Sequence, residues 1–337
     1  MIDYLKIRCF RGIESADFEN LARVNLIVGG NNTGKTSILE AFVLLFGDNE
    51  QIKRLPSEFR QSGNDQDVWA DFWPNIIHKM NDSSFRLETN EGVLWGGPVR
   101  DGHGLFRKGP EDDFSADRRF ASKSEEPMVS FSGRGGTVDA RFSKTAKRLS
   151  ILSTEQPDPL VTSELFNQIA PLNPENETKL EELLRDSIEP RLKRLRYARP
   201  QHKQQHLVYV DLGDGPMIPF TQMGQAFSRA LHVYCEIFSQ NPDILLIDEI
   251  ENGLYYRGLE KYWRGLFSVL EEQDVQLFST THSRECMEAA QKASSGEESE
   301  LRYLRLDREI DAPGRIIGTD FGANVMGDAM AFDQDMR

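Results

Sequence analysis

The sequence predicts an α/β protein with a doubly wound sheet at its core. Three observations support this fold class: a glycine-rich segment between a strand pattern and a helix pattern, an uninterrupted aliphatic run at Ile244–Ile247, and regular strand–helix alternation in the last third of the chain. An aliphatic run of this kind is typical of a central parallel strand, which is buried on both faces.

The hydrophobic pattern predicts each element in order. The first half contains a half-buried strand over Ile2–Phe10, a strand at Val24–Val28, a buried helix at Thr36–Phe46, a helix within Asp67–Met80, glycine-rich loops and short antiparallel strands at Gly92–Gly136, and a helix at Asn176–Ser187. The second half contains strands near Leu192–Tyr197 and Leu207–Asp211, a helix at Gln225–Ser239, the strand Ile244–Ile247, a helix at Leu259–Leu270, a strand at Val275–Phe278, a helix at Ser283–Ala293, two further strands and a last helix near Ala323–Phe332. We therefore expect one domain, residues 1–337, with a core from 1–90 and 205–337 and an inserted α+β lobe at about 91–204.

Composition narrows the class of protein. The 337 residues carry a formal net charge of −14, which argues against a surface that binds nucleic acid throughout and leaves room for a local basic patch. The sequence has no apolar run long enough to cross a bilayer and no signal-peptide pattern. Its three cysteines, Cys9, Cys235 and Cys286, lack metal-ligand spacing and suit free thiols. We expect a cytoplasmic protein without a membrane partner.

The segment from Gly29 to Thr36, GGNNTGKT, fits the phosphate-binding pattern G-x-x-x-x-G-K-[ST]. Glycines let backbone N–H groups turn towards phosphates, and the following helix directs its positive end at them. Lys35 is expected to reach the β- and γ-phosphates of ATP, and the Thr36 hydroxyl to ligate Mg²⁺. The alternative, a chance match in a glycine-rich turn, is disfavoured because a strand precedes the segment and a helix follows it. The predicted nucleotide contacts are Gly29, Asn31, Asn32, Thr33, Gly34, Lys35, Thr36 and Ser37.

Two acidic residues, Asp248 and Glu249, directly follow the aliphatic strand. A parallel strand delivers such residues to the edge of the sheet where phosphates bind. Asp248 is expected to hold Mg²⁺, and Glu249 to orient and deprotonate the attacking water. An acid that caps a following helix is the alternative, and the presence of the phosphate loop argues against it.

Four segments together resemble the ATPase heads of the RecF, SMC and OLD group. They are NLIVGGNNTGKTSILEAFVLL with CFRG before it, IPFTQMGQAFSRAL, ILLIDEIENGL and STTHS, and they follow one another in the order of that group. The resemblance covers residues 1–50 and 217–285. It implies a P-loop NTPase of the ABC type, with a mixed sheet core, that binds and hydrolyses ATP with Mg²⁺.

The resemblance also implies roles for residues outside the phosphate loop. Thr221 and Gly224, before a predicted helix, would bind the γ-phosphate held by a second head, and His282 would contact that phosphate. Asn252 and Gly253 would cross between two heads, and Arg11 would approach the nucleotide unless it is a surface arginine. Gln222 replaces the first glycine of the usual signature, whereas Thr221 keeps the hydroxyl. Gln51, Gln61 and Gln66 all remain candidates for the glutamine that such heads place near Mg²⁺.

The segments that are missing also bear on function. The spacing of about 180 residues between phosphate loop and signature lacks sustained heptads, so no long coiled coil is expected. The 55 residues after His282 would not hold a nuclease domain. We expect a stand-alone ATPase subunit, forming a homodimer or higher homo-oligomer, that gates a separate effector such as a nuclease or toxin in anti-phage defence. Alternatives are a DNA-binding ATPase of repair or recombination and a scaffold stabilised by ATP.

Two weaker patterns remain. His202 and His206 form H-x-x-x-H, but Pro200 and the strand pattern that follows argue against a helical zinc site. Six cations form the densest basic cluster of the chain and could contact nucleic-acid phosphates, or could be a solvated strand face beside an acidic helix. They are Arg191, Lys193, Arg194, Arg196, Arg199 and Lys203.

Overall fold

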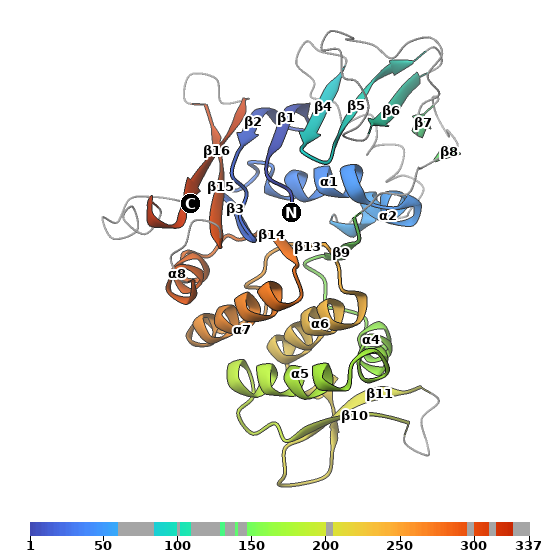
Figure 1. The fold of residues 1–337 in the computed structure, drawn as a ribbon, viewed down its shortest axis with the longest axis vertical. Coiled ribbons are helices and arrows are strands. Elements are labelled where there is room, and N and C mark those ends of the chain that lie inside the picture. Colours follow the sequence, from blue (N-terminus) through green and yellow to red (C-terminus); the bar gives the residue numbers. More distant parts are fainter. Residues whose placement is uncertain are drawn as a thin grey trace.

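The computed structural model describes residues 1–59, 84–99, 102–108, 129–131, 139–140, 147–199, 205–294, 300–309 and 315–325. Its centre is a mixed sheet of 13 strands that curls around helix α1, Lys35–Phe46 (Figure 1). In spatial order the strands are β8 (Asp139–Ala140), β7 (Val129–Phe131), β6 (Gly102–Lys108), β5 (Gly92–Val99), β4 (Phe85–Thr89), β1 (Leu5–Phe10), β2 (Ile13–Phe18), β16 (Ile316–Gly322), β15 (Leu301–Arg308), β3 (Val24–Gly29), β14 (Gln276–Thr280), β13 (Ile244–Ile247) and β9 (Leu149–Leu152).

The strands at the core of this sheet are parallel and buried on both faces. β15, β3, β14, β13 and β9 pair in parallel, and every residue of β13 is buried. Leu245 and Ile247 pack into one hydrophobic cluster, whereas Ile244 and Leu246 pack into the other. This alternation explains the uninterrupted aliphatic run, because both faces of the strand lie under helices.

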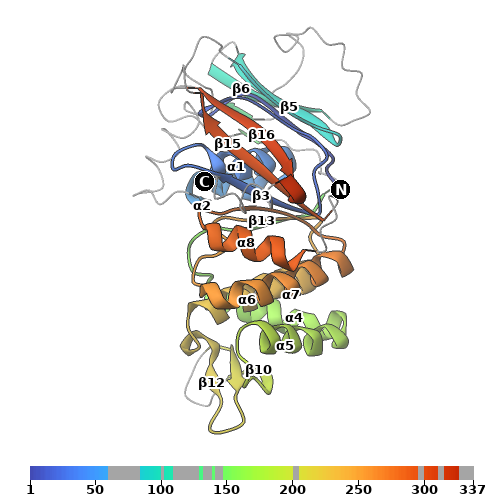
Figure 2. The same cartoon turned by 90° about the vertical axis from the view of Figure 1, so that its left-hand side faces the viewer.

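Helices cover the two faces of the sheet unequally. α1 and α2 (Asn49–Glu58) lie on one face, and α1 contacts β3, β14 and β5. On the other face, α6 (Gln225–Gln240), α7 (Leu259–Glu272) and α8 (Arg284–Ala293) are followed outward by α4 (Pro159–Leu172) and α5 (Pro174–Ser187) (Figure 2). A separate three-stranded sheet of β10 (Arg194–Ala198), β11 (Leu207–Asp211) and β12 (Ile218–Pro219) lies at the far end of these helices.

The predicted mixed α/β fold is confirmed, and the predicted strands and helices recur within a few residues in the described part of the chain. The helix expected within Asp67–Met80 lies outside the described residues, as does most of the helix that begins at Ala323. Among the described helices, none combines the length and apolar composition that a membrane span needs.

The boundaries predicted for an inserted lobe, 91 and 204, differ from the structure. β4, β5 and β6 continue the main sheet outward from β1 by antiparallel pairing, so this segment extends the core. β9 pairs in parallel with β13 and is also a core strand. The part that lies beyond the main sheet is therefore α4, α5 and the small sheet, which pack against α6 and α7 within one hydrophobic cluster. Sequence patterns missed this division because strand pairing joins positions that are distant in the chain, such as Ile244 and Leu149.

A buried glutamine ties the N-terminus to the central sheet. The side chain of Gln276, at the start of β14, accepts a hydrogen bond from the Ile2 N–H at 2.7 Å. Its amide donates to the carbonyls of Ile2 and Ala22, each at 2.9 Å. These bonds satisfy main-chain groups of the N-terminal segment that are otherwise shielded from water.

We predict that Gln276→Ala lowers the free energy of unfolding by about 2–4 kcal/mol, because three buried main-chain groups lose their partner. Urea denaturation would measure the change. Gln273→Ala, three residues earlier at the end of α7, is the matched control and should change stability by less than about 0.5 kcal/mol. Equal effects of the two substitutions would refute the structural role of Gln276.

Candidate nucleotide-binding site

The phosphate loop runs from the end of β3 to the start of α1. Gly29 has φ of 140°, and a Cβ atom there would lie 2.3 Å from the Leu306 carbonyl oxygen, so only glycine fits. Gly34, with φ of 87°, precedes α1 and supplies no side-chain cap. The first N–H groups of α1 therefore have no capping side chain, which is the arrangement that binds an anion at a helix N-terminus.

Lys35 lies folded back over this loop. Its Nζ donates to the carbonyls of Gly29 at 2.8 Å and Gly30 at 2.7 Å, and the Thr33 hydroxyl also donates to Gly30 at 2.9 Å. The residue is only 5% exposed. Burial lowers the Lys35 pKa to about 8, although the carboxylates of Asp248 and Glu249 oppose this shift. A buried ammonium held by carbonyl dipoles is suited to bind phosphate oxygens.

The remaining loop residues differ in exposure. Asn31 and Asn32 are exposed, Thr36 is half-buried and Ser37 is buried. Asn32 has φ of 58°, and its carbonyl accepts a hydrogen bond at 2.8 Å from Arg308 of β15. The C-terminal strands thus help to fix the outer side of the loop.

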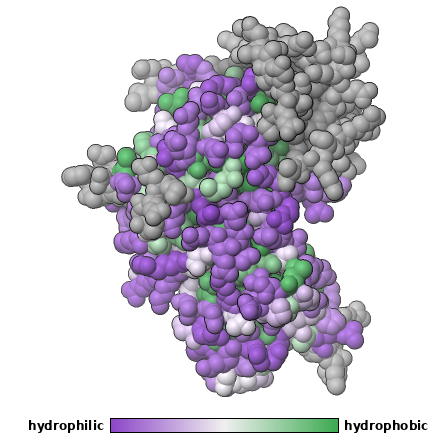
Figure 3. Space-filling view, viewed as in Figure 1, coloured by the Kyte–Doolittle hydropathy of each residue, from purple (hydrophilic) through white to green (hydrophobic). Residues whose placement is uncertain are grey.

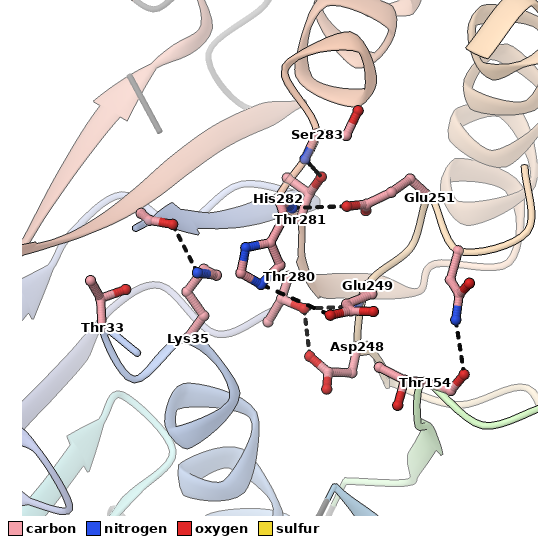
Figure 4. A network of polar contacts seen from close by, with 12 residues as sticks. Thr33, Lys35, Thr154, Asp248, Glu249, Glu251, Thr280, Thr281, His282 and Ser283 are labelled. Atoms are coloured by element: carbon pink, nitrogen blue, oxygen red, sulfur yellow. Dashed lines mark hydrogen bonds and ion pairs between the residues drawn. The ribbon is translucent and has the colours of Figure 1, made fainter. Parts of the chain in front are cut away.

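Asp248 and Glu249 follow β13 and are held by one hydroxyl from the neighbouring strand (Figure 4). The Thr280 hydroxyl donates to Asp248 Oδ1 at 2.5 Å and accepts from the Glu249 N–H at 2.8 Å. Asp248 is 5% exposed, and burial raises its pKa even though the Thr280 and Thr36 hydroxyls stabilise the charged form. Carboxylate and hydroxyl oxygens are the ligands Mg²⁺ prefers, so Asp248 and Thr36 fit the predicted metal site.

Glu249 and His282 face each other at the same edge of the sheet. His282 Nε2 lies 3.9 Å from Glu249 Oε1, and both side chains are about 40% exposed. Glu249 has φ of 50°, a backbone conformation that a non-glycine residue rarely adopts. The His282 N–H donates to Glu251 Oε1 at 2.8 Å, which fixes the start of the segment leading into α8. The three predicted catalytic residues, Lys35, Glu249 and His282, therefore lie in one constellation.

The predicted signature residues lie at the N-terminus of α6. Thr221 is exposed within a 3₁₀ turn at Phe220–Gln222. Gly224, with φ of 90°, precedes α6, has open space around it and supplies no side-chain cap. Among the described residues, no hydrogen bond joins Thr221 to Lys35, Asp248 or Glu249. The phosphate loop and the signature thus form two separate anion-competent helix N-termini.

Arg229, one turn into α6, is the site residue that sequence reasoning missed. Its buried guanidinium donates to the carbonyls of Asp248 at 2.7 Å and Glu249 at 3.2 Å. A second nitrogen of the same guanidinium donates to the carbonyls of Ser153 and Thr154, beyond β9, at 3.2 and 3.4 Å. Burial lowers the Arg229 pKa. The signal in the sequence was a cation inside the apolar helix Gln225–Ser239, where a charge needs a buried partner.

Two other predicted positions have clear surroundings. Arg11 is buried against Glu40 of α1, with its Nε 2.8 Å from Glu40 Oε2, so it is not a surface arginine. Gln51 donates to the Leu149 carbonyl at 2.7 Å and accepts from the Asp48 N–H at 3.0 Å. Gln61, Gln66, His202 and Lys203 lie outside the described residues. Within the described residues, no group of three or more metal-ligating side chains is close enough to hold an ion.

A protein family described as "AAA domain, putative AbiEii toxin, Type IV TA system" matches residues 24–288. The chain belongs to this family. The match includes the phosphate loop, the signature, the Asp248–Glu249 pair and His282. The chain therefore contains an AAA domain.

Solved structures show the same fold. An SMC head bound to the C-terminal winged-helix domain of ScpA covers 97% of this chain and 99% of its own length, with a TM-score of 0.57 and 11% identity. An SMC head with an extended coiled coil, bound to the C-terminal domain of ScpA from Pyrococcus furiosus, covers 98% and 99%, with a TM-score of 0.51 and 11% identity. At this identity the likeness concerns the fold.

Curated relatives match over short segments. An uncharacterized protein of Methanocaldococcus jannaschii is 46% identical over 50 residues, which are 15% of this chain and 23% of that protein. An ATP/GTP phosphatase of Helicobacter pylori is 27% identical over 74 residues, 21% of this chain and 20% of that protein. The chain thus aligns with about a fifth of the length of these relatives.

The buried ammonium of Lys35 predicts a specific pH dependence. Its pKa is about 8 in the folded protein and 10.5 ordinarily, so between these values the unfolded chain binds more protons. The free energy of unfolding should therefore rise with pH across this window. Lys35→Met has no such group, so we expect wild type to gain stability relative to Lys35→Met between about pH 8 and about pH 10.

Urea denaturation of both proteins at the two ends of this window measures the difference. The exposed Lys261→Met on α7 is the matched control and should follow the pH dependence of wild type. If Lys35→Met follows it as well, the lysine is not buried as described.

Proposed function

We propose that this protein binds ATP with Mg²⁺ and hydrolyses it at the constellation of Lys35, Asp248, Glu249 and His282. The observation that carries the proposal is the single Thr280 hydroxyl that holds Asp248 and the Glu249 backbone together at the edge of the sheet beside the phosphate loop. A metal ligand and a general base on adjacent residues are the arrangement that phosphoryl transfer to water requires.

Each residue has a distinct task in this reaction. Lys35 and the N–H groups at the start of α1 bind the phosphate oxygens. Thr36 and Asp248 would hold Mg²⁺, which supplies charge neutralisation between the phosphates when bound. Glu249 accepts the proton of the attacking water, because its exposed carboxylate, beside His282, is open to a water molecule. His282, which faces Glu249, donates a hydrogen bond to the γ-phosphate. This is the phosphate that water attacks as ADP leaves.

We further propose that two heads complete each site. Thr221 and Gly224 present exposed hydroxyl and N–H groups at a helix N-terminus that this chain's own phosphate loop does not contact. A second copy placed so that its α6 faces this phosphate loop would supply them to the γ-phosphate. Arg229 then connects the two parts, because it joins α6 to the Asp248 and Glu249 carbonyls. Nucleotide-driven pairing is thus coupled to the position of Asp248 and Glu249.

Pairing of heads would gate a separate effector protein in the cytoplasm, a nuclease or toxin of an anti-phage defence system. The description of the matching family names a toxin and a toxin–antitoxin system, which supports this role. The similar SMC heads are recorded in complex with domains of ScpA, which supports a head of this fold working with a separate protein. The effector is expected to distinguish open from closed heads, because hydrolysis would release the pair.

Mixing two inactive variants tests whether sites are shared between copies. Lys35→Ala removes the phosphate lysine but keeps the Thr221 surface, and Thr221→Arg keeps the phosphate loop but blocks that surface. We expect each variant alone to lose about 100-fold in ATP hydrolysis. An equimolar mixture should recover activity, because a mixed pair contains one complete site.

The measurement is steady-state phosphate release at constant total protein. Thr178→Arg places the same charge at an exposed position of α5 and should retain wild-type activity. A Thr221→Arg protein as active as wild type, or a mixture no faster than its components, would contradict shared sites.

A further inference from the structure

The hairpin of β10 and β11 forms the end of the molecule farthest from the main sheet (Figures 1 and 2). Residues 187–219, which contain it, carry six basic and three acidic side chains, whereas the whole chain carries 40 basic and 54 acidic ones. We call residues 193–199 and 206–211, which comprise β10, β11 and the residues next to them, the cationic hairpin. Its composition is opposite in sign to the rest of the protein, so a polyanion would be attracted to this end and repelled elsewhere.

Four of these cations form no close ion pair with a described residue, although the Arg194 charge interacts with the Glu181 carboxylate. Lys193, Arg194, Arg196 and Arg199 are exposed and, among the described residues, form no ion pair or side-chain hydrogen bond. Arg191 is different, because Glu189 binds it at 3.0 Å. The Asp211 carboxylate accepts from the Gly213 N–H at 2.8 Å. Most described cations elsewhere are paired, as Arg264 is with Glu260 at 2.8 Å.

The backbone of the cationic hairpin is held rigidly by the helices beneath it. The Leu195 N–H donates to Glu181 of α5 at 2.7 Å, and the Val208 N–H donates to Ser163 of α4 at 3.1 Å. Arg185 donates to the Leu192 carbonyl at 2.7 Å. Leu195 and Val208 are fully buried. The cations therefore project from a fixed support, which reduces the entropy lost when a ligand orders them.

The geometry of the strand places the cations at regular intervals. Arg194 and Arg196 lie on the outward face of β10, about 6.6 Å apart along the strand, because successive side chains alternate. At the end of the hairpin where the two strands are connected, the exposed His206 ring stacks on Tyr197, with centroids 5.0 Å apart and 16° between the planes. Alternation along β10 places Tyr197 on the face opposite Arg194 and Arg196. The hairpin therefore carries spaced cations on one face and an exposed ring at its connected end, and cations and aromatic rings are the two features that single-stranded nucleic-acid sites combine.

We propose that the cationic hairpin binds the phosphodiester backbone of a single-stranded nucleic acid, with a base against His206. Lys193, Arg194, Arg196 and Arg199 contact phosphates. An acidic protein would find the same cations, but it would have no use for the stacked rings, and these favour nucleic acid. The site lies on α4 and α5 and not at the nucleotide edge of the sheet, so binding is expected without ATP and independently of head pairing.

The test is fluorescence anisotropy of the full-length protein with labelled oligo(dT) and oligo(U) and no nucleotide. Four phosphate contacts predict a slope of about −3 for log affinity against log salt, since each contact contributes about −0.7. Arg194→Gln with Arg196→Gln should weaken binding about tenfold and halve the slope. Similar affinity for both oligomers indicates backbone recognition, and preference for one identifies DNA or RNA as the ligand; either result supports the proposal.

One control and one further variant make the result decisive. Lys261→Gln with Lys292→Gln removes the same charge from exposed positions of α7 and α8 and should leave binding unchanged. His206→Ala should weaken oligonucleotide binding about fivefold. Absence of oligonucleotide binding, binding unaffected by the hairpin substitutions, or displacement of the oligonucleotide by polyglutamate at equal charge would overturn the assignment. The last result would assign the surface to an acidic protein.

Discussion

The parallel register between β13 and β14 is the constraint on which the site depends. Ile247 pairs with Ser279, so the next residues of the two strands, Asp248 and Thr280, emerge side by side. One hydroxyl can then hold both the Asp248 carboxylate and the Glu249 backbone. A shift of one residue in this pairing would turn Thr280 to the opposite face, and Asp248 and the Glu249 N–H would lose the hydroxyl that holds them. The buried Gln276 side chain of β14, bonded to Ile2 and Ala22, opposes such a shift.

Helix α6 extends this local arrangement across the molecule. The exposed Thr221 and Gly224 lie just before its first residue, and one turn into the helix Arg229 donates to the carbonyls of Asp248 and Glu249. Further along, His232 Nδ1 shares a hydrogen bond of 2.9 Å with the Thr162 hydroxyl of α4. Burial lowers the pKa of His232 to about 4. Because Arg229 and His232 lie on one helix, displacement of its N-terminus would affect both the Asp248–Glu249 turn and the outer helices. Hydrophilic residues cover most of the coloured part of the face in Figure 3.

The sequence was most informative where function requires a fixed local pattern. The phosphate loop, Asp248 and Glu249 could be predicted because glycine conformations, a helix N-terminus and a buried strand leave a signal within a few residues. The place of β9 could not, because its pairing with β13 joins Leu149 to Ile244. The partners of Arg229 could not either, because main-chain carbonyls that tertiary structure brings to a side chain leave no sequence signal. The conformation of Glu249 was also unpredictable, because positive φ in a non-glycine residue is imposed by tertiary contacts.

ATP-driven pairing of heads is the central claim, and the mass of the Glu249→Gln protein by light scattering tests it most directly. This substitution keeps the shape of the side chain while removing the base, so bound ATP should persist. We expect a monomer without nucleotide and twice that mass with ATP and Mg²⁺, whereas the Lys35→Ala, Glu249→Gln double variant should stay monomeric. A mass that does not change on adding ATP, whether that of a monomer or of a preformed assembly, would contradict nucleotide-driven pairing.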